Sequence, residues 1–123
     1  MADEITYNVV LSCRNGSFDF TRSVSNTIDQ NTVGGAVPGT QSIGTTHELV
    51  DVLADLTAEG YFIATNLDTT NFVEIGVDVS ATFYPLIRLK AGESSMGRLS
   101  PGVAVYAKAD TAACQLQFQC LED

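Results

Sequence analysis

His47 is the only histidine of the chain and the first residue to consider for chemistry. It precedes Glu48, as in the first half of a zinc-protease helix, but the residue four positions on is Asp51 and there is no second histidine. Serine catalysis would need the same histidine, and no G-x-S-x-G segment presents a serine. We therefore expect His47 to be a solvated side chain.

The carboxylates Asp51, Asp55 and Glu59 would lie on one face of a helix if their segment were helical, which raises the question of a calcium site. The spacing of an EF-hand loop, with its glycine and closing glutamate, is missing. We expect a solvated acidic surface there. Asp68 and Asp78 are expected in turns or on the surface rather than as a glycosidase pair.

The remaining reactive side chains also lack a recognisable site. The cysteines Cys13, Cys114 and Cys120 are an odd count without C-x-x-C spacing, so a disulfide framework or a zinc site is not indicated, and we expect buried small apolar side chains. The glycine-rich phosphate-binding motifs G-x-x-x-x-G-K and G-x-G-x-x-G are both absent from the sequence. The sequence thus predicts no catalytic, cofactor-binding or metal-ligating residue, and no enzyme.

Composition predicts a single globular domain with an acidic surface. Of the 123 residues 45% are hydrophobic, while 6 Lys and Arg face 15 Asp and Glu, for a formal net charge of −9. Such a surface repels nucleic-acid phosphates and anionic lipids, so neither is an expected partner. The apolar runs are too short to span a membrane, and the opening M-A-D-E is unlike a signal peptide, which predicts synthesis in a cytoplasm.

The first third of the chain predicts a β-hairpin. Residues 5–14 are rich in β-branched and aromatic side chains, Asn15-Gly16 suits a type I′ turn, and residues 17–24 place Phe18 and Phe20 on one face. Residues 27–33 could form another short strand. Residues 34–39 are rich in glycine and proline and predict a surface loop.

Further strands are predicted after Gly60. Before it, residues 40–44 show only a weak strand pattern. The expected strands are residues 61–65, 71–79, 83–89, 103–109 and 114–120. Pro85 suggests an edge strand, and Pro101-Gly102 suits the centre of a type II turn. The last strand alternates, with Cys114, Leu116, Phe118 and Cys120 on one face and three glutamines on the other.

Residues 46–58 fit two interpretations. Leu49, Val50, Leu53 and Leu56 have helical spacing, with Gly60 as a stop, whereas residues 49–53 also suit a strand. Pattern alone slightly favours the helix. Together the elements predict an all-β fold, an antiparallel β-sandwich or barrel of eight or nine short strands in one domain over residues 1–123.

Three segments resemble a family of small β-rich virion accessory proteins of tailed bacteriophages. They are residues 64–76 (A-T-N-L-D-T-T-N-F-V-E-I-G), 83–93 (F-Y-P-L-I-R-L-K-A-G-E) and 98–114 (R-L-S-P-G-V-A-V-Y-A-K-A-D-T-A-A-C), which make up a third of the chain and come in the family's order. Residues 40–52 also look like the family's upstream strand pair, and this likeness favours a strand over residues 47–53.

The resemblance implies a jelly-roll-like sandwich and a non-enzymatic capsid decoration or cement protein on the outside of the phage head. It implies the major capsid protein as partner, self-association as a homotrimer, and no family catalytic residue. The alternative is a tail, baseplate or fibre module that recognises host-surface glycans. In the decoration role, residues 34–39 and the N-terminal residues 1–4 are expected to make assembly contacts.

Overall fold

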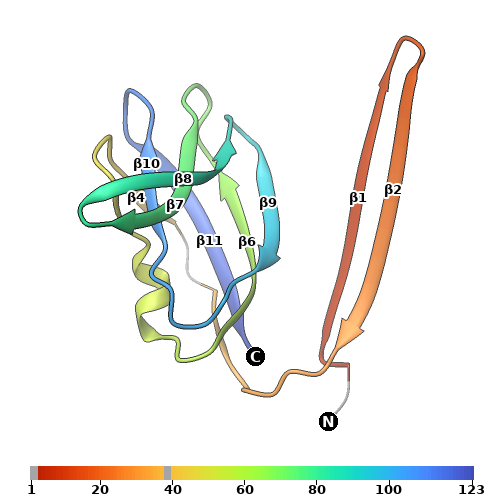
Figure 1. Ribbon diagram of the computed structural model, residues 1–123, viewed down its shortest axis with the longest axis horizontal. Coiled ribbons are helices and arrows are strands. Elements are labelled where there is room, and N and C mark those ends of the chain that lie inside the picture. The colour runs from red at the N-terminus through yellow and green to blue at the C-terminus, as the bar shows by residue number, and fades with distance from the viewer. Residues whose placement is uncertain (1–2, 38–39) are drawn as a thin grey trace. The chain divides into compact units, whose positions relative to one another are not determined.

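The described residues of the chain form two compact units, Met1–Asn31 and Thr32–Asp123. The structure, a computed structural model, describes residues 3–37 and 40–123. The first unit contains a two-stranded sheet, and the second contains all the other elements (Figure 1). A sandwich over residues 1–123 was expected, but the described sandwich strands all lie in the second unit.

The first unit is a long β-hairpin. Strands β1 (Ile5–Asn15) and β2 (Phe18–Ile28), eleven residues each, pair antiparallel along their whole length. The turn lies one residue later than predicted: Asn15 still pairs with Phe18, and Gly16, with φ +60°, is the first central residue, as a type II′ turn requires. The short strand predicted over residues 27–33 is wrong beyond Ile28, where β2 ends.

The second unit is an antiparallel sandwich of two sheets. In the first sheet, β11 (Cys114–Glu122) is central: it pairs with β6 (Glu59–Asn66) on one side and with β3 (Gly35–Ala36) and β4 (Gln41–Ile43) on the other, and β9 (Ser94–Arg98) flanks β6. The second sheet has the order β5 (Glu48–Leu49), β10 (Tyr106–Ala109), β7 (Val73–Val79) and β8 (Thr82–Leu89).

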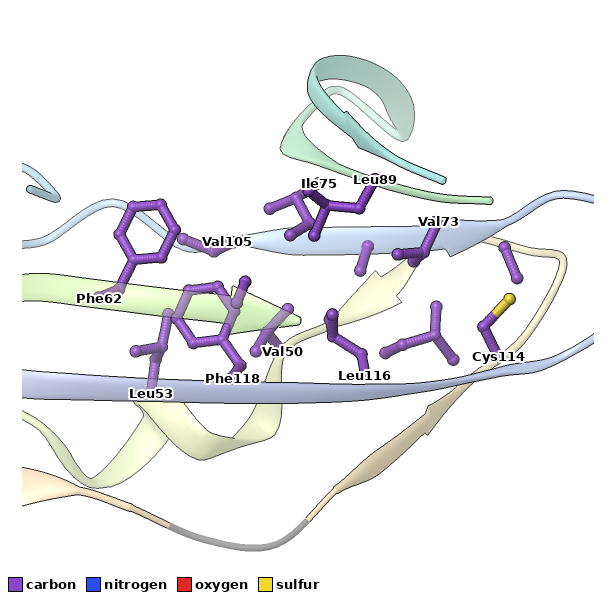
Figure 2. Packing of buried hydrophobic residues seen from close by; sticks show 14 of the residues in the cluster. Val50, Leu53, Phe62, Val73, Ile75, Leu89, Val105, Cys114, Leu116 and Phe118 are labelled. Atoms are coloured by element: carbon purple, nitrogen blue, oxygen red, sulfur yellow. The ribbon is translucent and has the colours of Figure 1, made fainter. Parts of the chain in front are cut away.

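Alternating side chains of the two sheets meet in one core (Figure 2). The predicted alternation of the last strand is confirmed, because Cys114, Leu116, Phe118 and Cys120 are all buried. The ring of Phe118 stacks on that of Phe62, with centroids 5.1 Å apart. The all-β sandwich is therefore confirmed; its jelly-roll connectivity is not.

Residues 47–53 are not one strand, which corrects the prediction drawn from the resemblance. Only Glu48–Leu49 is extended, and Asp51–Asp55 forms a 3₁₀ helix, η1. The helical spacing seen in the sequence explains this: Leu53 is buried, its N–H donates to the carbonyl of Val50 at 3.3 Å, and Leu56 N–H donates to Leu53 at 3.2 Å.

Several boundaries also differ from expectation. The described residues contain eleven strands rather than eight or nine. Strands β3 and β9 were not predicted, and β5 is the short extended part of the strand expected over residues 47–53. Within the predicted surface loop, Gly35–Ala36 is β3 and pairs with β11, while residues 38–39 lie outside the described part. Pro85 lies on an edge strand, as predicted, and Gly102 has the positive φ, +85°, of a type II turn.

A β-bulge lies in β8 at Leu86: Ile75 pairs with Ile87, and the next residue of β7, Gly76, pairs with Pro85, so Leu86 has no partner in β7. At this point the two backbones approach so closely that a Cβ on Gly76 would overlap the carbonyl oxygen of Tyr84. Only glycine fits there without a shift of the backbone.

Candidate binding surface

The hairpin has one apolar and one polar face. Residues paired directly across an antiparallel ladder lie on the same side of the sheet, so the register assigns every side chain to a face. We define the apolar face by its nine apolar members: Ile5, Tyr7, Val9, Leu11, Cys13, Phe18, Phe20, Val24 and Ile28. Asn15, Arg22 and Asn26 complete that side.

The opposite face of the hairpin is polar. Val10 is its one apolar side chain, and the remaining nine positions are Thr, Ser, Asn, Arg or Asp. This division is the pattern of a strand pair with one buried and one solvated side.

Much of the apolar face is nevertheless exposed. Leu11 is 64% exposed, Phe18 61% and Phe20 44%. An exposed sheet face of this kind marks a surface for association rather than a finished fold. The sequence analysis recognised the hairpin and the shared face of the two phenylalanines, but not the continuous apolar face. The alternation of β1, read together with that of β2, would have revealed it.

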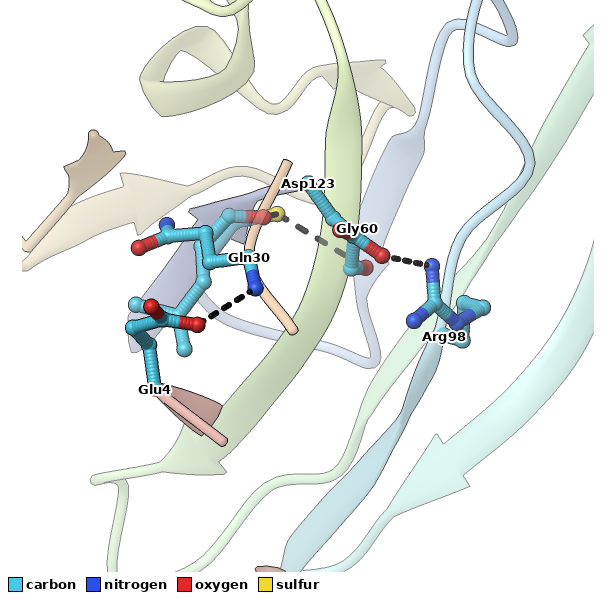
Figure 3. A network of polar contacts seen from close by, with 7 residues as sticks. Glu4, Gln30, Gly60, Arg98 and Asp123 are labelled. Atoms are coloured by element: carbon cyan, nitrogen blue, oxygen red, sulfur yellow. Dashed lines mark hydrogen bonds and ion pairs between the residues drawn. The ribbon is translucent and has the colours of Figure 1, made fainter. Parts of the chain in front are cut away.

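Polar contacts close the open end of the hairpin. Asp3 N–H donates to Oδ1 of Asp29 at 2.9 Å. Gln30 N–H donates to Oε2 of Glu4 at 3.1 Å (Figure 3). Of the predicted assembly segment 1–4, residues 1–2 lie outside the described residues. Asp3 and Glu4 bond to residues just after β2 and so fix where the hairpin begins and ends.

Charge separates the hairpin strands from the rest of the chain. Arg14, Asp19 and Arg22 are the charged residues of β1 and β2, a net of +1, whereas the whole chain carries −9. The acidic excess therefore lies outside these strands.

His47 is not the solvated side chain that the sequence predicted. Its Nε2 lies 2.6 Å from Oδ2 of Asp78, and its ring stacks on Phe83 with centroids 5.5 Å apart. Oδ1 of Asp78 accepts the N–H of Ala81 at 2.9 Å. These contacts tie the β7–β8 turn to the segment before β5, so a structural role accounts for them.

The predicted row of carboxylates does not form. Asp51 and Asp55 are exposed at the two ends of η1, while Glu59 begins β6, where its Oε2 accepts the N–H of Gly102 at 3.3 Å. Across residues 3–37 and 40–123, no group of three or more His, Cys, Asp or Glu side chains could hold a metal ion.

A buried polar side chain organises the loop after β6. Asn66 is fully buried, and its Nδ2 donates to the carbonyls of Asn71, at 2.9 Å, and Leu89, at 3.0 Å. Its Oδ1 accepts the N–H of Asp68 at 3.0 Å. Backbone N–H groups of Asn71 and Thr70 donate to the Asp68 carboxylate and lower its pKa. Asp68 is thus a turn residue, as predicted.

The three cysteines have two different environments. Cys114 and Cys120 are buried as expected, and burial raises the pKa of both thiols. Cys13 contradicts the expectation, because it is exposed on the apolar face of the hairpin, opposite Phe20. The local sequence places Cys13 among the apolar residues of its strand, but the described residues of the first unit contain no second sheet or helix that would bury this face.

The sandwich has an apolar hollow of about 290 Å³. Core side chains such as Phe62, Ile75 and Phe118 line it together with Leu86 and Arg98. Arg98 is held beside it, since its Nη1 pairs with Oδ2 of Asp123 at 2.7 Å (Figure 3). An apolar lining suits an apolar side chain better than a glycan, which needs several polar partners.

No helix in the part of the chain that the structure describes is long and apolar enough to cross a membrane. Comparison with models of known protein families, with curated proteins and with solved structures found no match to this chain.

Proposed function

We propose that this chain is a non-enzymatic structural protein of a tailed-bacteriophage virion, a decoration or cement protein bound to the outer surface of the head. The observation that carries the proposal is the exposed apolar face of the hairpin. Proteins that act alone rarely leave such a surface uncovered, so the chain is built to act within an assembly. The resemblance of residues 64–76, 83–93 and 98–114 to virion accessory proteins supports the same role.

In this role the major capsid protein is the partner. The acidic exterior is suited to a positively charged rim of the shell lattice, where complementary potentials guide docking. Binding only to the assembled shell, as a trimer at local three-fold axes, would stabilise the lattice by mass action. Synthesis in the bacterial cytoplasm fits the unpaired cysteines.

The test compares particles with and without this protein. Particles lacking it should lose their DNA at lower temperature or milder osmotic shock than complete particles, and added purified protein should restore survival. Survival that does not depend on the protein would contradict a cementing role.

Location and copy number separate this proposal from the alternative. Hundreds of copies over the head are expected for a decoration protein. A few copies at the tail, baseplate or fibres would instead favour the module for host-surface recognition.

A further inference from the structure

The hairpin needs a second layer that its own unit does not supply. A two-stranded hairpin alone is marginally stable in water, and three or more strands or a packed partner are needed to hold it. Strands β1 and β2 form a sheet of two, yet they place nine apolar side chains on one side. Burial of that side is the missing source of stability.

We propose that the apolar face of the hairpin is covered by the same face of a second copy of this chain. The inference deepens the proposed assembly role by naming the occupant of this surface, and it can fail or succeed independently of the virion role because it is tested on the purified protein. Self-complementary faces of this kind produce closed, symmetric oligomers.

Charge favours this contact between copies. Each chain carries −9, so most surfaces of two copies repel one another. The hairpin strands, with a net of +1, are the part at which copies can approach without that repulsion. No carboxylate lies on the apolar side, where Arg22 is the one charged residue.

Arg22 is compatible with face-to-face packing. Leu11 lies opposite Arg22 within one hairpin, and Val9 lies opposite Val24 in the next pair on the same side. Two face-to-face arrangements are possible. If the two-fold axis runs parallel to the strands, Arg22 faces Leu11 of the second copy. If the axis runs perpendicular to the strands and passes between the Leu11–Arg22 and Val9–Val24 pairs, Arg22 faces Val24 of the second copy. In both cases the guanidinium avoids its equivalent and its aliphatic stem packs on an apolar side chain.

Area predicts how tightly the copies associate. Eleven residues per strand and two strands give a face of roughly 37 Å by 10 Å at the usual strand rise and spacing. Two stacked faces therefore bury roughly 700–800 Å² before the uneven surface of the side chains is counted. This is below the roughly 1,200–2,000 Å² of stable interfaces and in the range of weak, transient ones. We expect association that depends on protein concentration rather than a permanent oligomer.

The experiment compares two substitutions of neighbouring, equally exposed residues. Leu11→Thr alters the apolar face, whereas Val10→Thr alters the opposite face; the two side chains are 64% and 66% exposed. Sedimentation velocity over a concentration series should show the unaltered protein as two associated chains that dissociate on dilution. Leu11→Thr should raise the dissociation constant at least tenfold, and Val10→Thr less than threefold.

Cys13 provides a second readout of the same contact. It lies on the apolar face and is exposed in the single chain, while Cys114 and Cys120 are buried and serve as internal references. Alkylation of Cys13 should slow as protein concentration rises. Thermal unfolding of each variant checks that the sandwich, whose core spans Ile43 to Cys120, is intact.

Three results would overturn the proposal. A monomer at all concentrations with Cys13 always protected would mean that the chain covers its own face. A monomer with Cys13 always reactive would mean that a different protein covers it. Association that is equally sensitive to both substitutions, or to neither, would mean that copies meet elsewhere.

Discussion

Asn66 shows how one buried polar side chain can hold three segments together. Its amide bonds the carbonyls of Asn71 and Leu89 and the N–H of Asp68. Asn66→Leu leaves these groups unpaired, so we expect a loss of roughly 2–4 kcal/mol in the free energy of unfolding. Urea titration would measure it as a lower midpoint at constant slope. Gln115→Leu, the matched change at an exposed position of β11, should cost far less.

Asp68 makes stability depend on pH. Because bonds from the N–H groups of Asn71 and Thr70 lower its pKa in the folded state, its contribution is present above the pKa of an unfolded aspartate, about 4, and is lost as pH falls through the lower folded pKa. Asp68→Asn should therefore destabilise the protein at pH 7, and its difference from the unaltered protein should shrink below about pH 4. Unfolding curves at pH 7, 4 and 3 would reveal a constant difference if this account were wrong.

The sequence shows which residues could be reactive, but it does not show which residues surround them in the folded protein. His47 and Asp78 are 31 positions apart, and no local pattern indicates that the end of β7 brings the aspartate to the histidine. The exposure of Cys13 could not be predicted either, because an apolar strand position normally implies a covering layer. The burial of Cys114 and Cys120 followed directly from alternation.

The bulge in β8, opposite Gly76 of β7, offers a test of how closely these two strands pack. A methyl group at Gly76 would meet the backbone of Tyr84 and Pro85, which cannot rotate away as a side-chain tip can. Gly76→Ala should lower the free energy of unfolding by about 1–3 kcal/mol, the usual range for overpacking. At Gly44 the nearest atom belongs to the flexible Glu48 side chain, so Gly44→Ala is the control. Equal losses from the two changes would contradict a backbone clash as the cause.

Strands with strong local signals were predictable, and strands defined by pairing were not. Alternation and turn residues gave β6, β7, β8 and β11 close to their observed bounds. Strand β9, with the sequence S-S-M-G-R, has little strand preference of its own and is extended because it pairs with β6. The spacing of the apolar residues favoured a helix where the 3₁₀ helix lies, whereas the resemblance to virion proteins favoured a strand and so gave the wrong prediction.

At the scale of the whole molecule, the division into two units predicts separable folding. The core of the sandwich is formed by residues from Ile43 to Cys120, with none from the hairpin. A chain beginning at Thr32 should keep cooperative unfolding, with a midpoint within about 5 °C of the full chain, or roughly 1 kcal/mol. Calorimetry would measure it.

A chain that ends before Cys114 is the control for this calorimetric measurement, because its sandwich should not fold. It lacks β11, which pairs with three other strands, and should not unfold cooperatively. Loss of cooperative unfolding on removal of the hairpin alone would show that the two units depend on each other.

The central position of β11 has a consequence for the order in which the protein takes shape on the ribosome. Its partners β3, β4 and β6 emerge long before it, so the first sheet stays without its middle strand until residue 122 has been synthesised. The hairpin, by contrast, needs only residues 5–28 and forms on the microsecond scale once they are free. Nascent chains on one messenger RNA therefore expose the apolar face of the hairpin to one another before the sandwich of either chain is complete.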